Sequence, residues 1–207
     1  MNVNLLVSTP NPVEVMYIAG RICRNKNVDA VLKEAKDKPQ EVKEKFIQKL
    51  IKAGHESILE HVSFTFVVSN ISRIATHQLV RHRVASYAQY SHRGMDDELT
   101  FIIPDSLSNK MNEKEEINNF IMGYLEQAGG FYYDLVKLGI PPEDARFMLP
   151  NGLASNIMFT MNGRELRHFL KLRLAKNAQW EIRQLAQEIL KILNDVCPVL
   201  VTDIKEE

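Results

Sequence analysis

Cysteine is scarce in this chain, which has only Cys23 and Cys197 among its 207 residues. A scaffold held together by several disulfides is therefore excluded, and because no secretory leader is evident we expect a cytoplasmic protein. No histidine stands next to either cysteine in the sequence. Both are therefore predicted to be core residues, and neither is expected to act as a nucleophile.

Net charge is also absent, because 26 lysines and arginines are balanced by 26 aspartates and glutamates. A protein that wraps nucleic acid normally carries a basic excess, so no nucleic-acid partner is expected. No apolar run approaches the length needed to cross a bilayer, so no membrane partner is expected either. The composition, 45% hydrophobic and 25% charged, is that of an ordinary globular protein.

Two familiar cofactor motifs are missing. The sequence has no Gly-x-Gly-x-x-Gly fingerprint, so a dinucleotide would not bind in a Rossmann crevice. Histidines stand beside acids at His55-Glu56 and Glu60-His61, but the His-Glu-x-x-His spacing of zinc proteases is absent and no cysteine is near. The sequence therefore predicts no metal site.

A dense run of hydrogen-bonding side chains is present from Gln78 to Arg93. It contains three arginines, two histidines, two glutamines, two serines and two tyrosines. The guanidinium group offers five donors in a planar fork that matches phosphate and carboxylate oxygens. The run predicts a site for a small anionic ligand with planar, hydrogen-bonding parts.

Apolar periodicity predicts mixed secondary structure. Helical spacing is found in residues 12–23, 42–51, 117–138, 162–170 and 182–193, and residues 29–36 are expected to add a short charged helix that ends before Pro39. Strands are predicted at 1–8, 62–68, 101–104 and 157–161. Strands and helices come in unequal clumps, and no linker or repeat interrupts them. We therefore expect one α+β domain over residues 1–207, with helices packed on a small, largely antiparallel sheet.

A helix is also predicted to lead into the donor-rich run, capped by Ser69-Asn70. Its buried face is expected to comprise Ile71, Ile74, Ala75 and Leu79. The opposite stripe carries Arg73, His77 and Arg81 at four-residue steps. Residues 87–91 are expected to be extended, so that successive side chains point at different parts of one ligand.

The spacing of Arg81-His82-Arg83 and Ser91 resembles the signature of the flavin-dependent thymidylate synthases, and Ser86 and Arg93 extend the match. The sequence departs from the family pattern where Ala88, Gln89, Gly94 and His168 stand. Collinear segments resemble other family blocks: Gly54–His61, Ala145–Pro150, Asn162–Arg164 with His168, and Leu172–Leu174 with Ala178–Ile182.

This resemblance implies reductive methylation of dUMP to dTMP by a homotetramer with shared active sites. Methylenetetrahydrofolate would supply the carbon, and FAD reduced by NADPH would supply the hydride. Because the flavin carries the redox chemistry, the protein would mainly bind, orient and polarise. No cysteine would attack the uracil ring.

The resemblance also implies roles for individual residues. Arg173 is expected to be catalytic, stabilising negative charge on the uracil ring. Substrate contacts are expected from Gln78, Leu79, Val80, Arg81, Gln89, Tyr90, Ser91, His92, Arg93, Arg146 and Arg173. Cofactor contacts are expected from His55, Ser57, Arg81, His82, Arg83, Gln89, Asn162, Gly163, Arg164 and His168.

Other interpretations remain open for these residues. Single arginines often form surface ion pairs that contribute about 0–1 kcal/mol. Asn162 is also suited to a structural role as a helix N-cap, in which Glu165 would complete a capping box. At the level of the whole chain, the alternatives are another flavin-dependent enzyme acting on pyrimidine nucleotides, or a non-catalytic module that binds nucleotides or RNA.

Overall fold

The computed structural model describes residues 1–92 and 99–205, so Arg93 and Gly94 of the predicted motif lie outside the described residues. With η marking 3-10 helices, the elements are β1 (Asn2–Ser8), α1 (Pro12–Ile22), α2 (Val28–Asp37), α3 (Gln40–Lys52), η1 (Glu56–His61), β2 (Ser63–Ser72), α4 (Arg73–Leu79), β3 (Ala85–Gln89), α5 (Asp105–Glu113), α6 (Glu115–Lys137), α7 (Pro142–Ala145), η2 (Arg146–Met148), β4 (Ala154–Asn162), α8 (Gly163–Arg173), α9 (Trp180–Val196) and η3 (Pro198–Leu200).

The chain forms two compact units. The first comprises Met1–Val68, Gln78–Ala88 and Met158–Glu207, and the second comprises Ser69–His77 and Gln89–Ile157. The chain passes from one unit to the other within β2, α4, β3 and β4. No helix among the described residues is long and apolar enough to span a bilayer.

The sheet has the strand order β1-β2-β4-β3 and is antiparallel. Thr65 and Thr160 place their Oγ1 atoms 2.9 Å apart, and the rings of Phe66 and Phe159 stack at 5.4 Å. Residue numbers thus rise along β2 as they fall along β4, as cross-strand pairing in an antiparallel ladder requires. The predicted α+β class with a small antiparallel sheet is confirmed.

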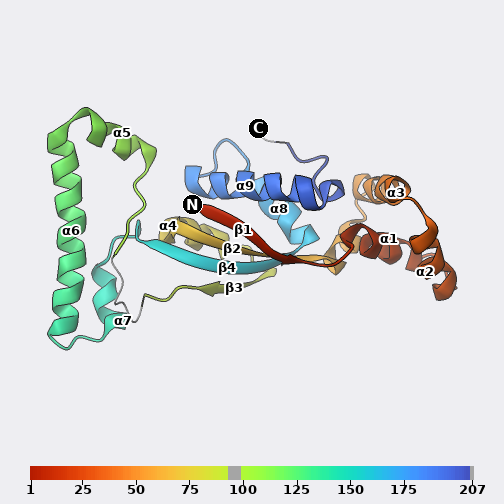
Figure 1. Ribbon diagram of the computed structural model, residues 1–207, viewed down its shortest axis with the longest axis horizontal. Coiled ribbons are helices and arrows are strands. Elements are labelled where there is room, and N and C mark those ends of the chain that lie inside the picture. Colours follow the sequence, from red (N-terminus) through yellow and green to blue (C-terminus); the bar gives the residue numbers. More distant parts are fainter. Residues whose placement is uncertain (93–98, 206–207) are drawn as a thin grey trace. The chain divides into compact units, whose positions relative to one another are not determined.

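The core of the first unit follows from the alternating pattern of β2. Phe64, Phe66 and Val68 are fully buried, and each such side chain contributes about 1.5–3 kcal/mol by leaving water. Helices α8 and α9 lie along one face of the sheet, while α1, α2 and α3 lie beyond one end of its strands (Figure 1).

The second unit is mainly helical. The long helix α6 runs without a break through Gly129 and Gly130, and Gly139 follows it with φ +88°. The predicted strand at 101–104 reduces to one isolated antiparallel bridge between Phe101 and Leu153. Helix α5 was not predicted, because all its apolar side chains are at least partly exposed and leave no clear stripe.

The predicted start of the helix at Ser69-Asn70 is wrong. Strand β2 continues to Ser72, with Asn70 in the left-handed region at φ 55°, and α4 begins only at Arg73. The cap is Ser72, whose Oγ accepts a hydrogen bond from Ala75 N at 3.1 Å. Ile74 is 46% exposed and does not belong to the predicted buried face.

The prediction that both cysteines are core residues is half wrong. Cys197 is buried, and burial raises the pKa of its thiol to about 11. Cys23 is exposed at the end of α1. By helical spacing Cys23 continues the face of Val13, Met16, Tyr17 and Gly20, but it stands at the C-cap where α1 ends, and its thiol donates to the carbonyl of Ala19 at 3.4 Å.

A buried arginine attaches the segment after α9 to α8. Arg167 is 1% exposed and donates to the carbonyl of Leu200 at 2.6 Å. It also donates to both carboxylate oxygens of Asp203, at 2.6 and 2.7 Å. A bidentate pair of this kind fixes the orientation of both side chains and also balances the charge of the guanidinium. The hydrogen bond from Arg167 lowers the pKa of the Asp203 carboxyl below its ordinary value.

We predict that Asp203→Asn lowers the free energy of unfolding at pH 7 by about 1–3 kcal/mol, because a buried guanidinium loses an ionised acceptor. A carboxyl whose pKa is lower in the folded state stabilises above the unfolded-state pKa and loses that contribution as pH falls through the folded-state pKa. Denaturant unfolding should therefore show the difference from wild type shrinking below about pH 4. Glu188→Gln, on an exposed pair with Lys191, is the control, and a deficit independent of pH would contradict the assignment.

Candidate functional site

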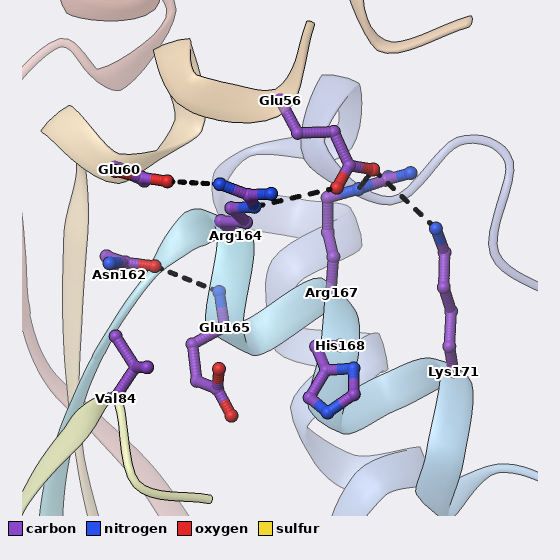
Figure 2. Close-up of a pocket in the computed structure, with 9 residues that line it drawn as sticks. All are labelled: Glu56, Glu60, Val84, Asn162, Arg164, Glu165, Arg167, His168 and Lys171. Atoms are coloured by element: carbon purple, nitrogen blue, oxygen red, sulfur yellow. Dashed lines mark hydrogen bonds and ion pairs between the residues drawn. The ribbon is translucent and has the colours of Figure 1, made fainter. Parts of the chain in front are cut away.

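In the first unit a pocket of about 410 Å³ lies at the start of α8 (Figure 2). It is lined by Glu56, Glu60, Val84, Asn162, Arg164, Glu165, Arg167, His168 and Lys171. Asn162 is the N-cap of α8, and its Oδ1 accepts from Glu165 N at 2.9 Å. The structural role predicted for Asn162 is thus confirmed, because this bond satisfies one of the free amides of the first turn.

Ion pairs converge on Glu56 along one wall of this pocket. Arg164, Arg167 and Lys171 all point toward its carboxylate, at 3.9, 3.7 and 3.7 Å (Figure 2). Arg164 also donates to Glu60 at 2.5 Å. These spacings follow from α8, where residues three and four apart share a face. The wall therefore presents several N–H donors that an anion could share with Glu56 and Glu60.

The chemistry of this donor set fits an anionic cofactor group. The Arg164 side chain is 54% exposed, so it is free to turn from Glu60 toward a ligand. The buried Nε of Arg167 has no hydrogen-bond acceptor among the described residues, and Glu56 Oε1 lies 3.7 Å away. Guanidinium forks bind phosphate oxygens in a bidentate manner.

The sequence pointed to Asn162, Arg164 and His168 in this pocket, and the structure brings those three together. It missed two further cations, Arg167 and Lys171, and the acids that pair with the cations, Glu56 and Glu60. The recurrence of cations at 164, 167 and 171 was a readable signal, since it marks one helix face. The two glutamates carried no comparable signal, because only tertiary contacts place η1 against α8.

A second cluster in the same unit surrounds His82. His82 is 4% exposed, and its Nδ1 lies 2.9 Å from Glu165 Oε1. Arg173 donates from Nε to His82 Nε2 at 3.2 Å and from Nη2 to the carbonyl of Gln78 at 3.3 Å. Burial lowers the pKa of His82, and partial burial followed by the Arg81 charge lowers the pKa of Arg173. Three residues predicted for the site, Gln78, His82 and Arg173, are thus in direct contact.

The second unit has a pocket of about 310 Å³ lined by Arg73, His77, His92, Arg146, Phe147, Leu149, Asn151 and Leu153. Arg146 donates to the carbonyl of Ser91 at 2.6 Å and to that of Glu143 at 3.2 Å. Neither bond neutralises its charge, since both acceptors are backbone oxygens. The stripe residues Arg73 and His77 share a pocket as their four-residue spacing predicts.

His92 and Gln89 are held by polar neighbours within this unit. The His92 ring is 2% exposed; Nε2 bonds the carbonyl of Ala154 at 2.9 Å, and Nδ1 lies 3.4 Å from Arg73 Nη1. Burial lowers the pKa of His92. Gln89 donates to Thr76 Oγ1 at 3.0 Å and to Ser155 Oγ at 3.3 Å. Tyr90 lies edge-on to His92 at 4.6 Å.

The remaining predicted site residues do not line either pocket. Leu79 is buried, and its carbonyl accepts from Tyr87 Oη at 2.8 Å. Val80, Arg81 and Arg83 are exposed in and after the turn that follows α4, and His55 and Ser57 are exposed beside and within η1. Gly163 has a packing role, because a Cβ there would lie 2.9 Å from the carbonyl oxygen of Leu59. Arg93 is outside the described residues.

Comparison with known proteins supports the resemblance found in the motifs. The family model for the thymidylate synthase complementing protein matches residues 4–199. A flavin-dependent thymidylate synthase from Geobacter sulfurreducens is 40% identical over 207 residues, covering 98% of this chain and 86% of the relative. Proteins with the same name from Sulfurisphaera tokodaii (42% identical, 97% and 76% covered) and Clostridium tetani (39% identical, 97% and 85% covered) also match. The chain therefore belongs to the flavin-dependent thymidylate synthase family.

Proposed function

We propose that this protein converts dUMP to dTMP, taking the carbon from methylenetetrahydrofolate and the reducing hydride from NADPH by way of FAD. The observation that carries the proposal is the close, nearly full-length relationship to enzymes that bear this name. The cation-lined pockets support it, because the nucleotide and the dinucleotide cofactor are both anionic.

The pocket at the start of α8 is the proposed site for part of FAD, with Arg164, His168 and Lys171 as its N–H donors. Bound FAD would supply the redox chemistry. The protein would orient it, and cations near the flavin would favour its reduced, anionic form. Arg164 would exchange its surface pair with Glu60 for the cofactor, at little cost because exposed ion pairs contribute about 0–1 kcal/mol.

Arg146 and Ser91 are proposed to bind the phosphate of dUMP, together with Arg93 from outside the described residues. A phosphate monoester carries nearly two negative charges, which suit a guanidinium whose present acceptors are uncharged carbonyls. Gln78, Arg81 and Gln89 stand in the matching motif and are proposed as further nucleotide contacts in the shared active sites of the homotetramer.

Arg173 is proposed to act on the uracil ring. A guanidinium held in place at Nε and Nη2 would stabilise negative charge as the ring becomes nucleophilic, without reorganising during the reaction. Neither cysteine is proposed to act as a nucleophile. Burial keeps the thiol of Cys197 protonated at neutral pH by raising its pKa to about 11, and Cys23 lies exposed at the end of α1.

We also propose a cytoplasmic homotetramer in which residues 1–207 act as one catalytic domain. Large exposed apolar side chains on α6 support association, because Phe120, Tyr124 and Phe131 are 79, 57 and 52% exposed. Patches of this kind mark contact surfaces more often than isolated exposed residues do. The two rival functions, a non-catalytic nucleotide-binding module and a flavoenzyme for another pyrimidine nucleotide, are separated by the experiment that follows.

The purified protein should be yellow, and NADPH should bleach its bound flavin without oxygen. Adding dUMP and methylenetetrahydrofolate should then restore the oxidised spectrum and yield dTMP, measured by chromatography. A protein that takes up no FAD would favour the non-catalytic module. A flavin that is reduced but forms no dTMP would indicate a different nucleotide substrate.

Replacing the proposed catalytic cation should affect turnover but not the flavin. We expect Arg173→Ala to lower kcat by about 10²–10³-fold, the usual effect of removing one group that stabilises transition-state charge, with the flavin absorbance unchanged. Lys176→Ala, an exposed cation just beyond α8, should behave as wild type. Unchanged turnover in Arg173→Ala would remove this residue from the mechanism.

Replacing Arg164 should instead affect the binding of the flavin. We expect Arg164→Ala to weaken FAD binding by about tenfold or more, the equivalent of one charge-assisted hydrogen bond, as measured by quenching of flavin fluorescence. Glu60→Gln should tighten binding, because it frees the same guanidinium. If both variants bind FAD as wild type does, the pocket at the start of α8 does not hold the cofactor's anionic part.

A further inference from the structure

The hydrogen bonds around His82 determine which of its ring nitrogens carries the proton. A guanidinium has five N–H donors and no acceptor. Because Arg173 Nε points at His82 Nε2 from 3.2 Å, that nitrogen has to offer its lone pair. The ring proton is then on Nδ1, where it is donated to Glu165 Oε1 at 2.9 Å. His82 is accordingly a neutral imidazole in the Nδ1–H form.

A charged imidazolium does not fit this arrangement. It would direct a second N–H at the N–H of Arg173 and place two cations 3.2 Å apart around a ring that is 4% exposed. Repulsion between like charges is large where water is scarce. Burial, the largest influence on the group, also lowers the pKa of His82 and so favours the neutral ring.

A metal ion fits no better. His82, Glu165 and His168 bring their ligand atoms within 4.8 Å of one another. However, a metal on His82 Nδ1 would replace the proton given to Glu165 and add a divalent cation close to Arg173. The lone pair on Nε2 is already used by the guanidinium. The hydrogen-bonded chain uses each nitrogen of His82 once and leaves no such conflict.

The course of α8 explains why a bridging histidine is needed. Glu165 and Arg173 are both on this helix, eight residues or about 12 Å of helix rise apart. That separation is too long for a direct hydrogen bond. His82 comes from the turn after α4 and spans it, while Asn162 fixes the backbone of Glu165 through the N-cap bond.

We propose that Glu165 is a positioning residue for Arg173, acting through His82. By accepting the Nδ1 proton, its carboxylate holds the imidazole in the one tautomer that can receive Arg173 Nε, and so orients the guanidinium. Glu165 has no direct contact with substrate in this role. The inference rests on the proposed function only in that Arg173 acts on the uracil ring.

Histidine side-chain nitrogen NMR on the ¹⁵N-labelled protein tests the tautomer directly, without substrates. His82→Gln assigns the signal by removing it. We expect wild type to show a protonated Nδ1 and an unprotonated Nε2 at pH 7. Glu165→Gln, whose amide oxygen still accepts from Nδ1, should keep this pattern, whereas Glu165→Leu should lose it.

Steady-state kinetics on the same variants test the consequence. We expect Glu165→Leu to lower kcat by about 10²-fold, as for a slightly misplaced catalytic group, with little change in the KM for dUMP or in bound flavin. Glu165→Gln should retain most of the turnover, and thermal unfolding monitors folding. A merely structural role predicts parallel losses of stability in both variants with the tautomer unchanged.

Three outcomes would overturn the inference. They are an Nε2–H or doubly protonated His82 in wild type, wild-type kcat in Glu165→Leu, or stoichiometric Zn²⁺ shifting the signals of both His82 and His168. A protein that makes no dTMP would instead contradict the proposed function, and the NMR result would still decide the tautomer. The two failures are therefore distinguishable.

Discussion

The antiparallel pairing of β3 with β4 is the constraint from which the arrangement around Arg173 follows. Tyr87 packs on Phe159 across this pair, so the start of β3 lies beside the end of β4. The turn that carries His82 comes just before β3, and α8 follows β4 directly. His82 and Glu165, 83 residues apart in the chain, consequently meet at one edge of the sheet.

Helix α8 carries polar site residues of the first unit along its whole length. The N-cap Asn162 precedes it, and its first turn carries the carboxylate that reaches His82. The cations that face Glu56 recur from Arg164 to Lys171, and its last residue is Arg173. A short helix can do this because its core face is strongly apolar, with Leu166, Phe169 and Leu170 fully buried. The buried stripe fixes the rotation of the helix, and the rotation decides which polar residues face which partner.

Charge balance distinguishes the two pockets. In the first unit the cations of the pocket are matched by Glu56, Glu60 and Asp203, so a ligand there has to compete for donors already engaged. In the second unit Arg146 gives its hydrogen bonds to backbone carbonyls, which leaves its charge uncompensated by those bonds. A strongly charged phosphate suits the second environment, and a cofactor with several polar groups suits the first.

The sequence by itself determined the strongly periodic helices and strands, the family, and the positions at which an unusual residue type stands. Asn162 was readable as an N-cap because capping is local chemistry, and the cation stripes were readable because helical spacing is regular. The start of α4 was not readable, because strand pairing carried β2 past Asn70 to Ser72. Only the tertiary structure decided which acid each basic side chain meets: Glu56 for the α8 cations, Asp203 for Arg167, and Glu165 for His82. Those contacts join segments far apart in the chain, and a glutamate has the same appearance in a sequence whether it faces water or a buried imidazole.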